Sequence, residues 1–349
     1  MTTQPDIQSD IQSSADEPIA APPSTMRAAV ARTYGTADVV TIEDIPTPTA
    51  GTGQVVLRVE ASSLNALDWH YLTGTPYFLR LIAGVRRPKR LIHGADVAGT
   101  VVTVGADVTS LRPGDIVFGE CFGGGCAPYV AIKVSAVVPI PDGVSFAAAA
   151  ATPVAGLTAL QGLRTHGDVE PGDRVLINGA AGGVGTFAVQ IAKALGAEVT
   201  AVCSTRNVDM VRRLGADHVV DYTADDFVAG GARFDVMLDN VGNRTAAECR
   251  SVMRPGGRYV AVSGPKSNRW LGPLPHLLRV RVGFIRAAAT FHQFTASPNY
   301  DDLMHLVELL ASGAIVPEID RTVGLDGVAD ALTEIGSGHA RAKIVVTPT

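Results

Sequence analysis

The chain has 349 residues, of which 46% are hydrophobic and 18% charged, a size and composition typical of two packed domains rather than a fibrous or disordered protein. Its formal net charge of −5 gives no global attraction to nucleic acid, so a nucleic-acid-binding role is disfavoured. Four cysteines, at 121, 126, 203 and 249, are too few for a disulfide framework. Their spacing also departs from paired zinc ligands, so we assign them no metal.

Residues 1–25 contain acidic side chains, no Lys or Arg and few apolar residues, which predicts a disordered tail. This segment fits neither a secretory nor a mitochondrial address, so a cytoplasmic location is expected. Two uncharged stretches, 143–163 and 175–192, approach the length of a membrane span. Proline, glycine and the change of periodicity inside them indicate the interior of a folded domain instead.

From residue 26 to about 139 the sequence consists of short β-type runs separated by turn residues, which predicts a β-rich domain. The predicted strands are 27–33, 54–61, 97–104, 115–119 and 129–132.

Beyond residue 171 strands alternate with helices, which indicates βαβ units and a parallel sheet. The predicted strands are 174–178, 198–203, 218–221, 234–239 and 258–263, and the predicted helices are 184–195, 208–214 and 246–253. After residue 300 we expect a helix to 310, a strand at 318–323, a helix at 325–335 and a strand at 343–347. These last elements return to the first domain.

The most informative motif is Gly179-Ala-Ala-Gly-Gly-Val-Gly185, which follows an apolar strand and opens a helix. Glycines in this position permit a tight turn and a close approach of the backbone to a pyrophosphate at the helix amino terminus. We therefore expect Gly179, Gly182, Gly183, Val184 and Gly185 to bind a dinucleotide.

The next strand ends in Ser204-Thr-Arg-Asn207, where an NAD-selective site usually carries Asp or Glu. Arg206 and the Ser204 hydroxyl suit a 2′-phosphate, so NADPH is favoured over NADH. Asp209 is the one nearby carboxylate that could reach back to the ribose.

Several separated motifs resemble the zinc-free quinone oxidoreductase (zeta-crystallin-like) branch of the medium-chain dehydrogenase/reductase superfamily, over nearly all of the chain after residue 26. Besides the glycine loop they are Asn65-Ala-Leu-Asp68, His93-Gly-Ala-Asp-Val-Ala-Gly99, Arg112-Pro-Gly-Asp115, Thr152-Pro-Val-Ala-Gly-Leu-Thr158, Leu214-Gly-Ala-Asp217 and Asp239-Asn-Val-Gly242.

The resemblance implies an α/β fold in which a doubly wound Rossmann sheet, residues 153–296, is inserted into a GroES-like substrate domain, residues 26–152 and 297–349. It places Thr158, Asn240 and Val241 near the nicotinamide, and Tyr222 and Lys343 near the adenosine-phosphate half of the cofactor. It also implies a homodimer or homotetramer.

Zinc-dependent relatives carry a catalytic Cys where this chain has Asn65, and a His where it has Ala95. The resemblance therefore implies an enzyme without zinc. Without a Lewis acid, hydride transfer favours a quinone or an α,β-unsaturated carbonyl, which spreads the incoming charge by conjugation.

Asn65 is expected to donate an amide hydrogen bond to the oxygen that gains charge, and His70 to deliver the proton, with Tyr71 as the alternative donor. Thr158 completes the expected catalytic set. Asp68 is equally well explained as a buried carboxylate that fixes its loop through backbone amides.

Two alternatives stay open: an alkenal or enoyl-thioester reductase, and a sensor that binds NADPH without turnover. Residues 77–93 and 266–294 are apolar, carry Arg or Lys and contain no acidic residue. Membrane contact by these segments is the less favoured interpretation, against pocket walls or a subunit interface.

Overall fold

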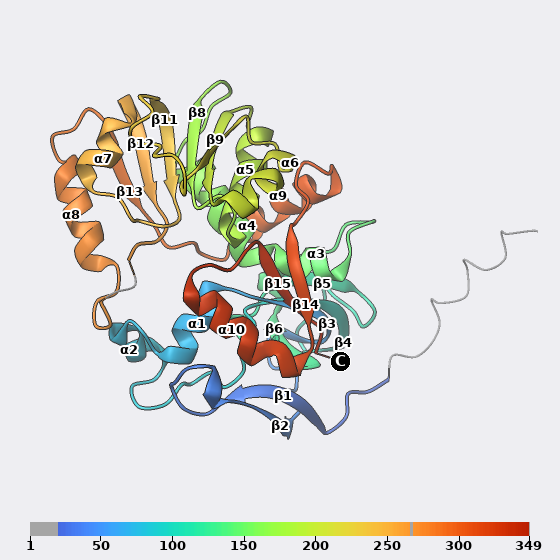
Figure 1. Ribbon diagram of the computed structural model, residues 1–349. Coiled ribbons are helices and arrows are strands. Elements are labelled where there is room, and N and C mark those ends of the chain that lie inside the picture. The colour runs from blue at the N-terminus through green and yellow to red at the C-terminus, as the bar shows by residue number, and fades with distance from the viewer. Residues whose placement is uncertain (1–19, 266–267, 349) are drawn as a thin grey trace, which may run out of the picture.

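The computed structural model describes residues 20–265 and 268–348 (Figure 1). Most of the tail expected at 1–25 lies outside the described residues. Strand β1 begins at Thr25, inside the predicted tail, and the Ser24 carbonyl accepts a hydrogen bond from the Thr47 amide.

The first sheet holds seven strands in the order β14-β15-β3-β4-β5-β7, with β6 paired to β3, and a hairpin of β1 and β2 lies apart from it. Valines and leucines of β3, β4 and β5 form its core. The strands are β1 (Thr25–Ala31), β2 (Val40–Pro46), β3 (Gln54–Leu64), β4 (Asp96–Val104), β5 (Ile116–Glu120), β6 (Tyr129–Lys133), β7 (Val137–Pro139), β14 (Ile319–Val323) and β15 (Lys343–Val346).

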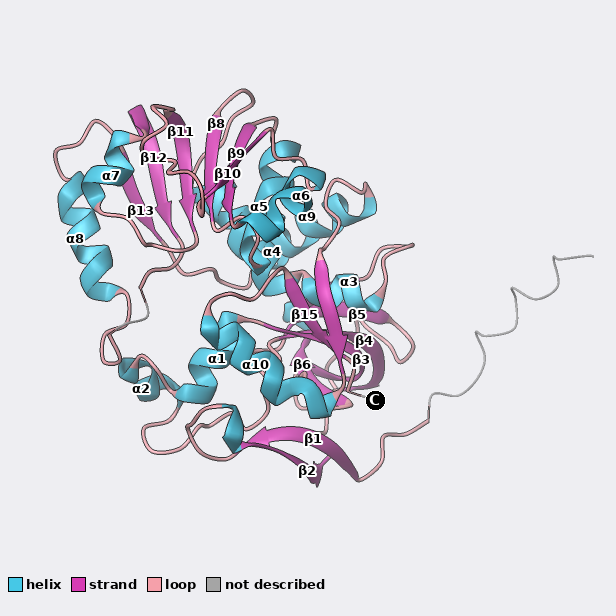
Figure 2. Cartoon of the chain, viewed as in Figure 1, coloured by secondary structure: helices cyan, strands magenta, loops and turns pink. Residues whose placement is uncertain are grey.

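Helices α1 and α10 pack on each other beside this sheet, and α3 packs on strands β3 and β4 (Figure 2). The helices associated with this part of the chain are α1 (Ala66–Thr73), α2 (Arg80–Ala83), α3 (Phe146–Ala151) and α10 (Val328–Ser337).

The second sheet is entirely parallel, in the order β10-β9-β8-β11-β12-β13. Its strands are β8 (Arg174–Asn178), β9 (Glu198–Cys203), β10 (His218–Asp221), β11 (Phe234–Asp239), β12 (Met253–Ala261) and β13 (Thr290–Gln293). Its helices are α4 (Pro153–Leu160), α5 (Gly183–Ala194), α6 (Val208–Arg213), α7 (Ala246–Ser251), α8 (Leu274–Phe284) and α9 (Tyr300–Ala311).

Both faces of this sheet are covered, as in a doubly wound fold. Val175 and Ile177 of β8 pack toward α4, α5 and α9, whereas Leu176 between them packs toward α7 and α8. This alternation follows from the two-residue period of a strand. The predicted fold class, a parallel Rossmann-type sheet beside a β-rich domain, is confirmed.

The two uncharged stretches form ordinary elements of this fold: 143–163 supplies α3 and α4, and 175–192 supplies β8, the glycine loop and α5. Within the described ranges, no helix combines the length and the hydropathy that crossing a bilayer requires.

Candidate active site

The glycine loop lies between β8 and α5, where β15 of the first sheet meets the second sheet (Figure 1). Gly179 has a φ of 78°, which favours glycine. A Cβ on Gly185 would come within 2.2 Å of the Gly179 carbonyl oxygen, so only glycine fits there as well. The Ala342 amide donates to the Ala181 carbonyl at 2.8 Å and fixes the loop against the other sheet.

Helix α5 begins at Gly183 without a side-chain cap, because its N-cap residue is Gly182. The amides of its first turn have no partner within the helix and carry the positive end of its dipole. They can receive the phosphates of a dinucleotide, as the sequence predicts.

The turn Asn240-Val241-Gly242 follows the neighbouring strand β11 and is held by Asp239. This fully buried carboxylate accepts the amides of Val241 and Gly242 at 3.0 and 2.9 Å. It also accepts the Tyr259 hydroxyl at 2.7 Å. Asp239 therefore sets the shape of the turn that faces the glycine loop, where Val241 Cγ2 would lie 2.8 Å from a Cβ on Gly179.

The side-chain amide of Asn240 is shielded from solvent, and among the described residues neither its oxygen nor its nitrogen has a hydrogen-bond partner. A buried amide without partners is costly, so a group outside the protein chain, such as a ligand or a water molecule, is expected to complete it. Together with the uncapped helix α5, this orphaned group shows that the residues present fit a nicotinamide dinucleotide.

The predicted 2′-phosphate site lies where β9 and β10 end. Arg206 follows Ser204 and donates through Nη2 to the His339 carbonyl at 2.8 Å. Tyr222 is exposed, and its amide donates to the Cys203 carbonyl at 3.0 Å. Asp209 is 91% exposed and lies 3.7 Å from Arg212 on the surface of α6.

Asn65 is the N-cap residue of α1, and its amide is clamped between two charges. Its Nδ2 donates to Asp96 Oδ2 at 2.8 Å, and its Oδ1 accepts a short hydrogen bond from the Lys343 ammonium. Lys343 Nζ is also 3.4 Å from Asp96 Oδ2. One N–H of the Asn65 amide therefore remains for another acceptor.

The expectation that Lys343 lies at the adenosine-phosphate half of the cofactor stays a prediction. The side chain is only 2% exposed, its ammonium is bound to Asn65 and Asp96, and its Cδ would lie 3.2 Å from a Cβ on Gly183 at the start of α5. Burial lowers its pKa, whereas the nearby carboxylates, chiefly Asp96, oppose that change.

Asp96 is a fully buried carboxylate on which several elements converge. Besides Asn65 and Lys343, it accepts the Ser63 hydroxyl at 2.8 Å and the Val154 amide of α4 at 3.0 Å. It thereby joins β3, β15 and α4. Asp96 and Asp239 were not among the site residues expected from the sequence, although both stand inside motifs named there.

Asp68 has the structural role that was one of its two predicted explanations. Its carboxylate accepts the amides of Asn65 and Gly94, both at 2.8 Å. Burial raises its pKa to about 6, against the opposing effect of these two amides.

Each of the remaining expected catalytic residues has a contact of its own within the protein. His70 Nδ1 donates to the Thr75 carbonyl at 2.7 Å, and the ring of Tyr71 lies under the Arg90 guanidinium, 5.2 Å from its centroid. Thr158 is buried on α4, where its hydroxyl donates to the Val154 carbonyl at 2.6 Å. Thr158 can thus serve a ligand only as an acceptor.

A catalytic zinc does not fit the side chains around Asn65. The Lys343 ammonium already supplies a positive charge to the Asn65 oxygen and to Asp96, and a divalent cation there would be repelled. Over the described part of the chain, no three His, Cys, Asp or Glu side chains are grouped so that they could hold a metal. Cys121 and Cys126 are free thiols whose pKa values burial raises.

Two family models match the chain. The alcohol dehydrogenase GroES-like domain matches residues 51–142, and a family described as zinc-binding dehydrogenase matches residues 214–346. The chloroplastic quinone-oxidoreductase QR1 of Triphysaria versicolor is 32% identical over 319 residues, which cover 87% of this chain and 93% of the relative. The chain belongs to the quinone oxidoreductase branch of the medium-chain dehydrogenase/reductase superfamily.

Other relatives of this medium-chain oxidoreductase carry related names. The 2-methylene-furan-3-one reductase of Solanum lycopersicum is 32% identical and covers 93% of this chain and 80% of the relative. Among solved structures, the quinone oxidoreductase from Coxiella burnetii superposes with a TM-score of 0.81 at 28% identity, covering 93% of this chain and all of that one.

Proposed function

We propose that the chain is an NADPH-dependent reductase that transfers hydride to a quinone or to an α,β-unsaturated carbonyl compound without zinc. The observation that carries this proposal is the Asn65 amide, held between Lys343 and Asp96 beside the glycine loop. An amide N–H next to a buried ammonium can stabilise negative charge on a carbonyl oxygen in a site of low dielectric constant.

This means of stabilisation suits a conjugated acceptor. A single amide hydrogen bond and a nearby ammonium are a weaker electrophile than a metal ion, so the acceptor must itself delocalise the incoming charge. The relatives named as a quinone oxidoreductase and a methylene-furanone reductase act on acceptors of this kind, which supports the choice.

Bound NADPH would supply the hydride, and the chain would orient it. The first-turn amides of α5 would bind the pyrophosphate, while Asn240 and Val241 would contact the nicotinamide half. Arg206, Ser204 and Tyr222 support NADPH over NADH, because Asp209 points into solvent and Asp221 is bonded to the Thr223 amide at 3.0 Å.

The proton that completes reduction would come from His70 or Tyr71 on α1. His70 stays the first candidate because imidazole titrates near neutral pH. A His70→Gln variant should then lose the alkaline limb of the pH–rate profile, because the donor must be protonated to act, whereas Tyr71→Phe should keep that limb. The reverse result would assign the proton donor to Tyr71.

The oligomeric state, the cytoplasmic location and the domain limits remain predictions. An alkenal or enoyl-thioester reductase is the alternative enzyme, and an NADPH-binding sensor the alternative without turnover. The name of a structural neighbour, the CurK enoyl reductase, matches the first alternative at 25% identity and a TM-score of 0.80.

The proposal is tested by following NADPH absorbance in the presence of EDTA with phenanthrenequinone, benzoquinone, an alkenal and crotonyl-CoA, and then repeating each assay with NADH. Turnover with the quinones and NADPH is expected. Turnover confined to the alkenal or the thioester would favour the alternative enzyme. Tight NADPH binding without turnover would favour the sensor, and activity abolished by EDTA would overturn the zinc-free mechanism.

A further inference from the structure

Charge is distributed very unevenly along this acidic chain. Residues 69–95 and 249–300 contain thirteen of the 29 Lys and Arg residues and none of the 34 Asp and Glu residues. The rest of the chain is correspondingly acidic. Such a division creates a local positive field that the net charge of −5 conceals.

The fold brings these two acid-free segments together, although they belong to different sheets. The Tyr77 amide donates to the Arg269 carbonyl at 2.8 Å, and the rings of Tyr77 and Trp270 meet edge to face with centroids 5.1 Å apart. Helix α2 of one segment and helix α8 of the other consequently lie on the same side of the molecule (Figure 1).

Large apolar side chains project from both segments into solvent. Leu81 on α2 is 76% exposed, and Trp270 and Ile285 are each 72% exposed. We call this surface the basic apolar face. Its exposed apolar residues are Phe78, Leu81, Ile82, Val85, Trp270, Leu271, Leu274, Leu278, Val282 and Ile285.

Helix α8 has two apolar stripes. Leu277, Val280 and Phe284 are buried against the parallel sheet. A second stripe, formed by residues 274, 278, 282 and 285, follows helical spacing and faces outward. Because the first stripe already anchors the helix, the second is not needed for folding.

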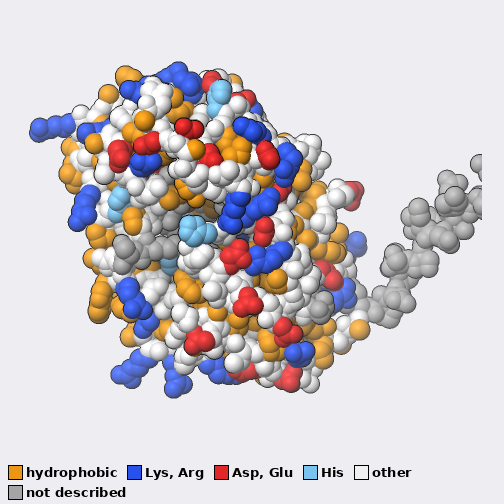
Figure 3. Space-filling view, in the orientation of Figure 1, with side chains coloured by type: hydrophobic (Ala, Val, Ile, Leu, Met, Phe, Trp, Pro, Cys, Tyr) orange, Lys and Arg blue, Asp and Glu red, His pale blue; other side chains and the backbone are white. Residues whose placement is uncertain are grey.

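Exposed cations flank the outward stripe and the tip of α2. They are Arg86, Arg87, Lys89, Arg269, Arg279, Arg281 and Arg286. Within the ranges that the structure describes, none of them forms an ion pair with a carboxylate. In Figure 3 orange and blue side chains follow the left margin, where α8 and α2 lie, and the red side chains visible in this view lie elsewhere.

We propose that the basic apolar face docks on an anionic lipid membrane. Leucine, isoleucine and tryptophan side chains at the surface can enter the boundary between headgroups and acyl chains, while the arginines contact lipid phosphates. The exposure of these side chains argues against walls of an internal pocket. A second copy of the same face would oppose arginines to arginines, and nucleic acid would leave the apolar stripe exposed to water.

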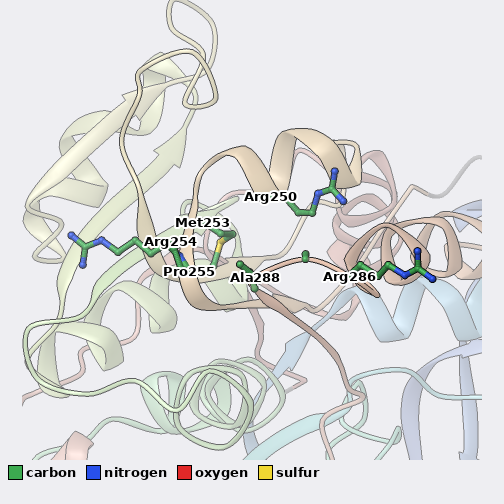
Figure 4. Close-up of a pocket in the computed structure, with 8 residues that line it drawn as sticks. Arg250, Met253, Arg254, Pro255, Arg286 and Ala288 are labelled. Atoms are coloured by element: carbon green, nitrogen blue, oxygen red, sulfur yellow. The ribbon is translucent and has the colours of Figure 1, made fainter.

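The pocket at the end of this face supplies no separate ligand site. It encloses about 300 Å³ beside the start of β12 and is lined by Arg250, Arg254 and Arg286. The three guanidinium groups point in different directions (Figure 4), and Arg254 is already paired with Asp235 at 2.8 Å. The open face, and not this recess, is therefore the surface that would contact a partner.

The test is flotation of the full chain with two kinds of vesicle, phosphatidylcholine alone and phosphatidylcholine mixed with phosphatidylglycerol. We expect binding at low salt to the anionic vesicles only, and release at high salt, because the electrostatic part is screened. Absence from anionic vesicles at low salt, or equal binding to neutral vesicles, would overturn the proposal.

Variants distinguish this face from the rest of the surface. Arg279→Glu/Arg281→Glu and Leu278→Ser/Val282→Ser should each lower vesicle partitioning at least about tenfold. Arg112→Glu/Lys133→Glu, which makes the same charge change at an exposed position in the turn before β5 and another at the end of β6, should leave it within about twofold. Circular dichroism confirms that each variant is folded.

Light scattering tests the alternative that a second copy of the chain covers the basic apolar face. If a second copy covers the face, Leu278→Ser/Val282→Ser will lower the molar mass in solution and the parent chain will not bind vesicles, which would overturn the proposal. An unchanged molar mass together with lost vesicle binding supports it. Neither readout depends on turnover, so the result is independent of the proposed reductase activity.

Discussion

The buried ammonium of Lys343 donates a hydrogen bond to the amide oxygen of Asn65, 278 residues earlier in the chain. The same ammonium lies 3.4 Å from the Asp96 carboxylate, which accepts a hydrogen bond from the amide nitrogen of Asn65. Opposite charges at its two ends fix the orientation of this amide, so its remaining N–H has a defined direction.

Lys343→Met should destabilise the protein by about 3–5 kcal/mol, because it leaves the Asp96 carboxylate buried without a compensating charge. Urea unfolding measures this loss. In the double variant Lys343→Met/Asp96→Asn both charges are absent. Its loss of unfolding free energy should therefore be smaller, by at least about 1 kcal/mol, than the sum of the losses in Lys343→Met and in Asp96→Asn.

The exposed pair of Arg32 and Glu43 supplies the matched control for that cycle. Arg32 is more than half exposed, and solvent screens the pair. Alanine at both positions should show a coupling well below that of the buried pair. Strict additivity at residues 343 and 96 would contradict the assigned interaction.

Asn65→Ala should lower kcat by about 10²–10³-fold with little change in the KM for NADPH, because it removes a donor to the oxygen that gains charge. Steady-state kinetics with a quinone measures both constants. Ser63→Ala is the control, since Ser63 donates to the same carboxylate at 2.8 Å but is fully buried. Equal losses of kcat in the two variants would mean that Asn65 acts only by holding Asp96 in place and does not donate to the substrate oxygen.

Local patterns were sufficient to predict most of the parallel sheet. Strands β8, β9, β10 and β11 coincide with the predicted runs, because each is a short apolar segment bounded by turn residues. Strand β12 begins five residues before the predicted start. Its Pro-Gly-Gly sequence indicates a turn, but the parallel pairing with β11 extends across a register shift at Phe234 and Val236.

Helix α8 and strand β13 were not predicted, because two stripes of apolar residues with arginines between them obscure a single helical periodicity. The site of Lys343 could not be found from local sequence either. It depends on the antiparallel pairing of Ile344 with Leu64, a contact between opposite ends of the chain. Long-range pairing of this kind leaves no mark in the spacing of nearby residues.

Arg206→Ala should raise the KM for NADPH by about 10–100-fold and change that for NADH by less than about threefold, because only NADPH carries the phosphate that the guanidinium would bind. Initial rates with each cofactor measure the ratio. Arg212→Ala, an exposed arginine on α6 that lies near Asp209, controls for the loss of positive charge. A parallel loss for both cofactors would assign Arg206 to the contact with His339 alone.

Glu120 should make the protein less stable as pH rises from about 4.5 to about 8. Burial raises the pKa of this carboxyl to about 8, and the neighbouring Asp96 and Asp68 carboxylates act in the same direction. Between the ordinary and the raised pKa the folded protein holds a proton that the unfolded chain has released, so unfolding becomes easier with each step in pH.

Glu120→Gln removes this titration. Its unfolding free energy relative to the parent chain should therefore increase by a few kcal/mol between about pH 5 and about pH 8.5, at about 1.4 kcal/mol for each unit of pKa shift. Urea unfolding at several pH values measures the difference. Glu43→Gln should show no change over this range, because a hydrogen bond from Arg32 lowers the pKa of that exposed carboxyl and its titration therefore lies below about pH 4.5. A constant difference for Glu120→Gln would mean that Glu120 ionises at its ordinary pKa, and that the buried cluster around Lys343 carries one more negative charge at neutral pH.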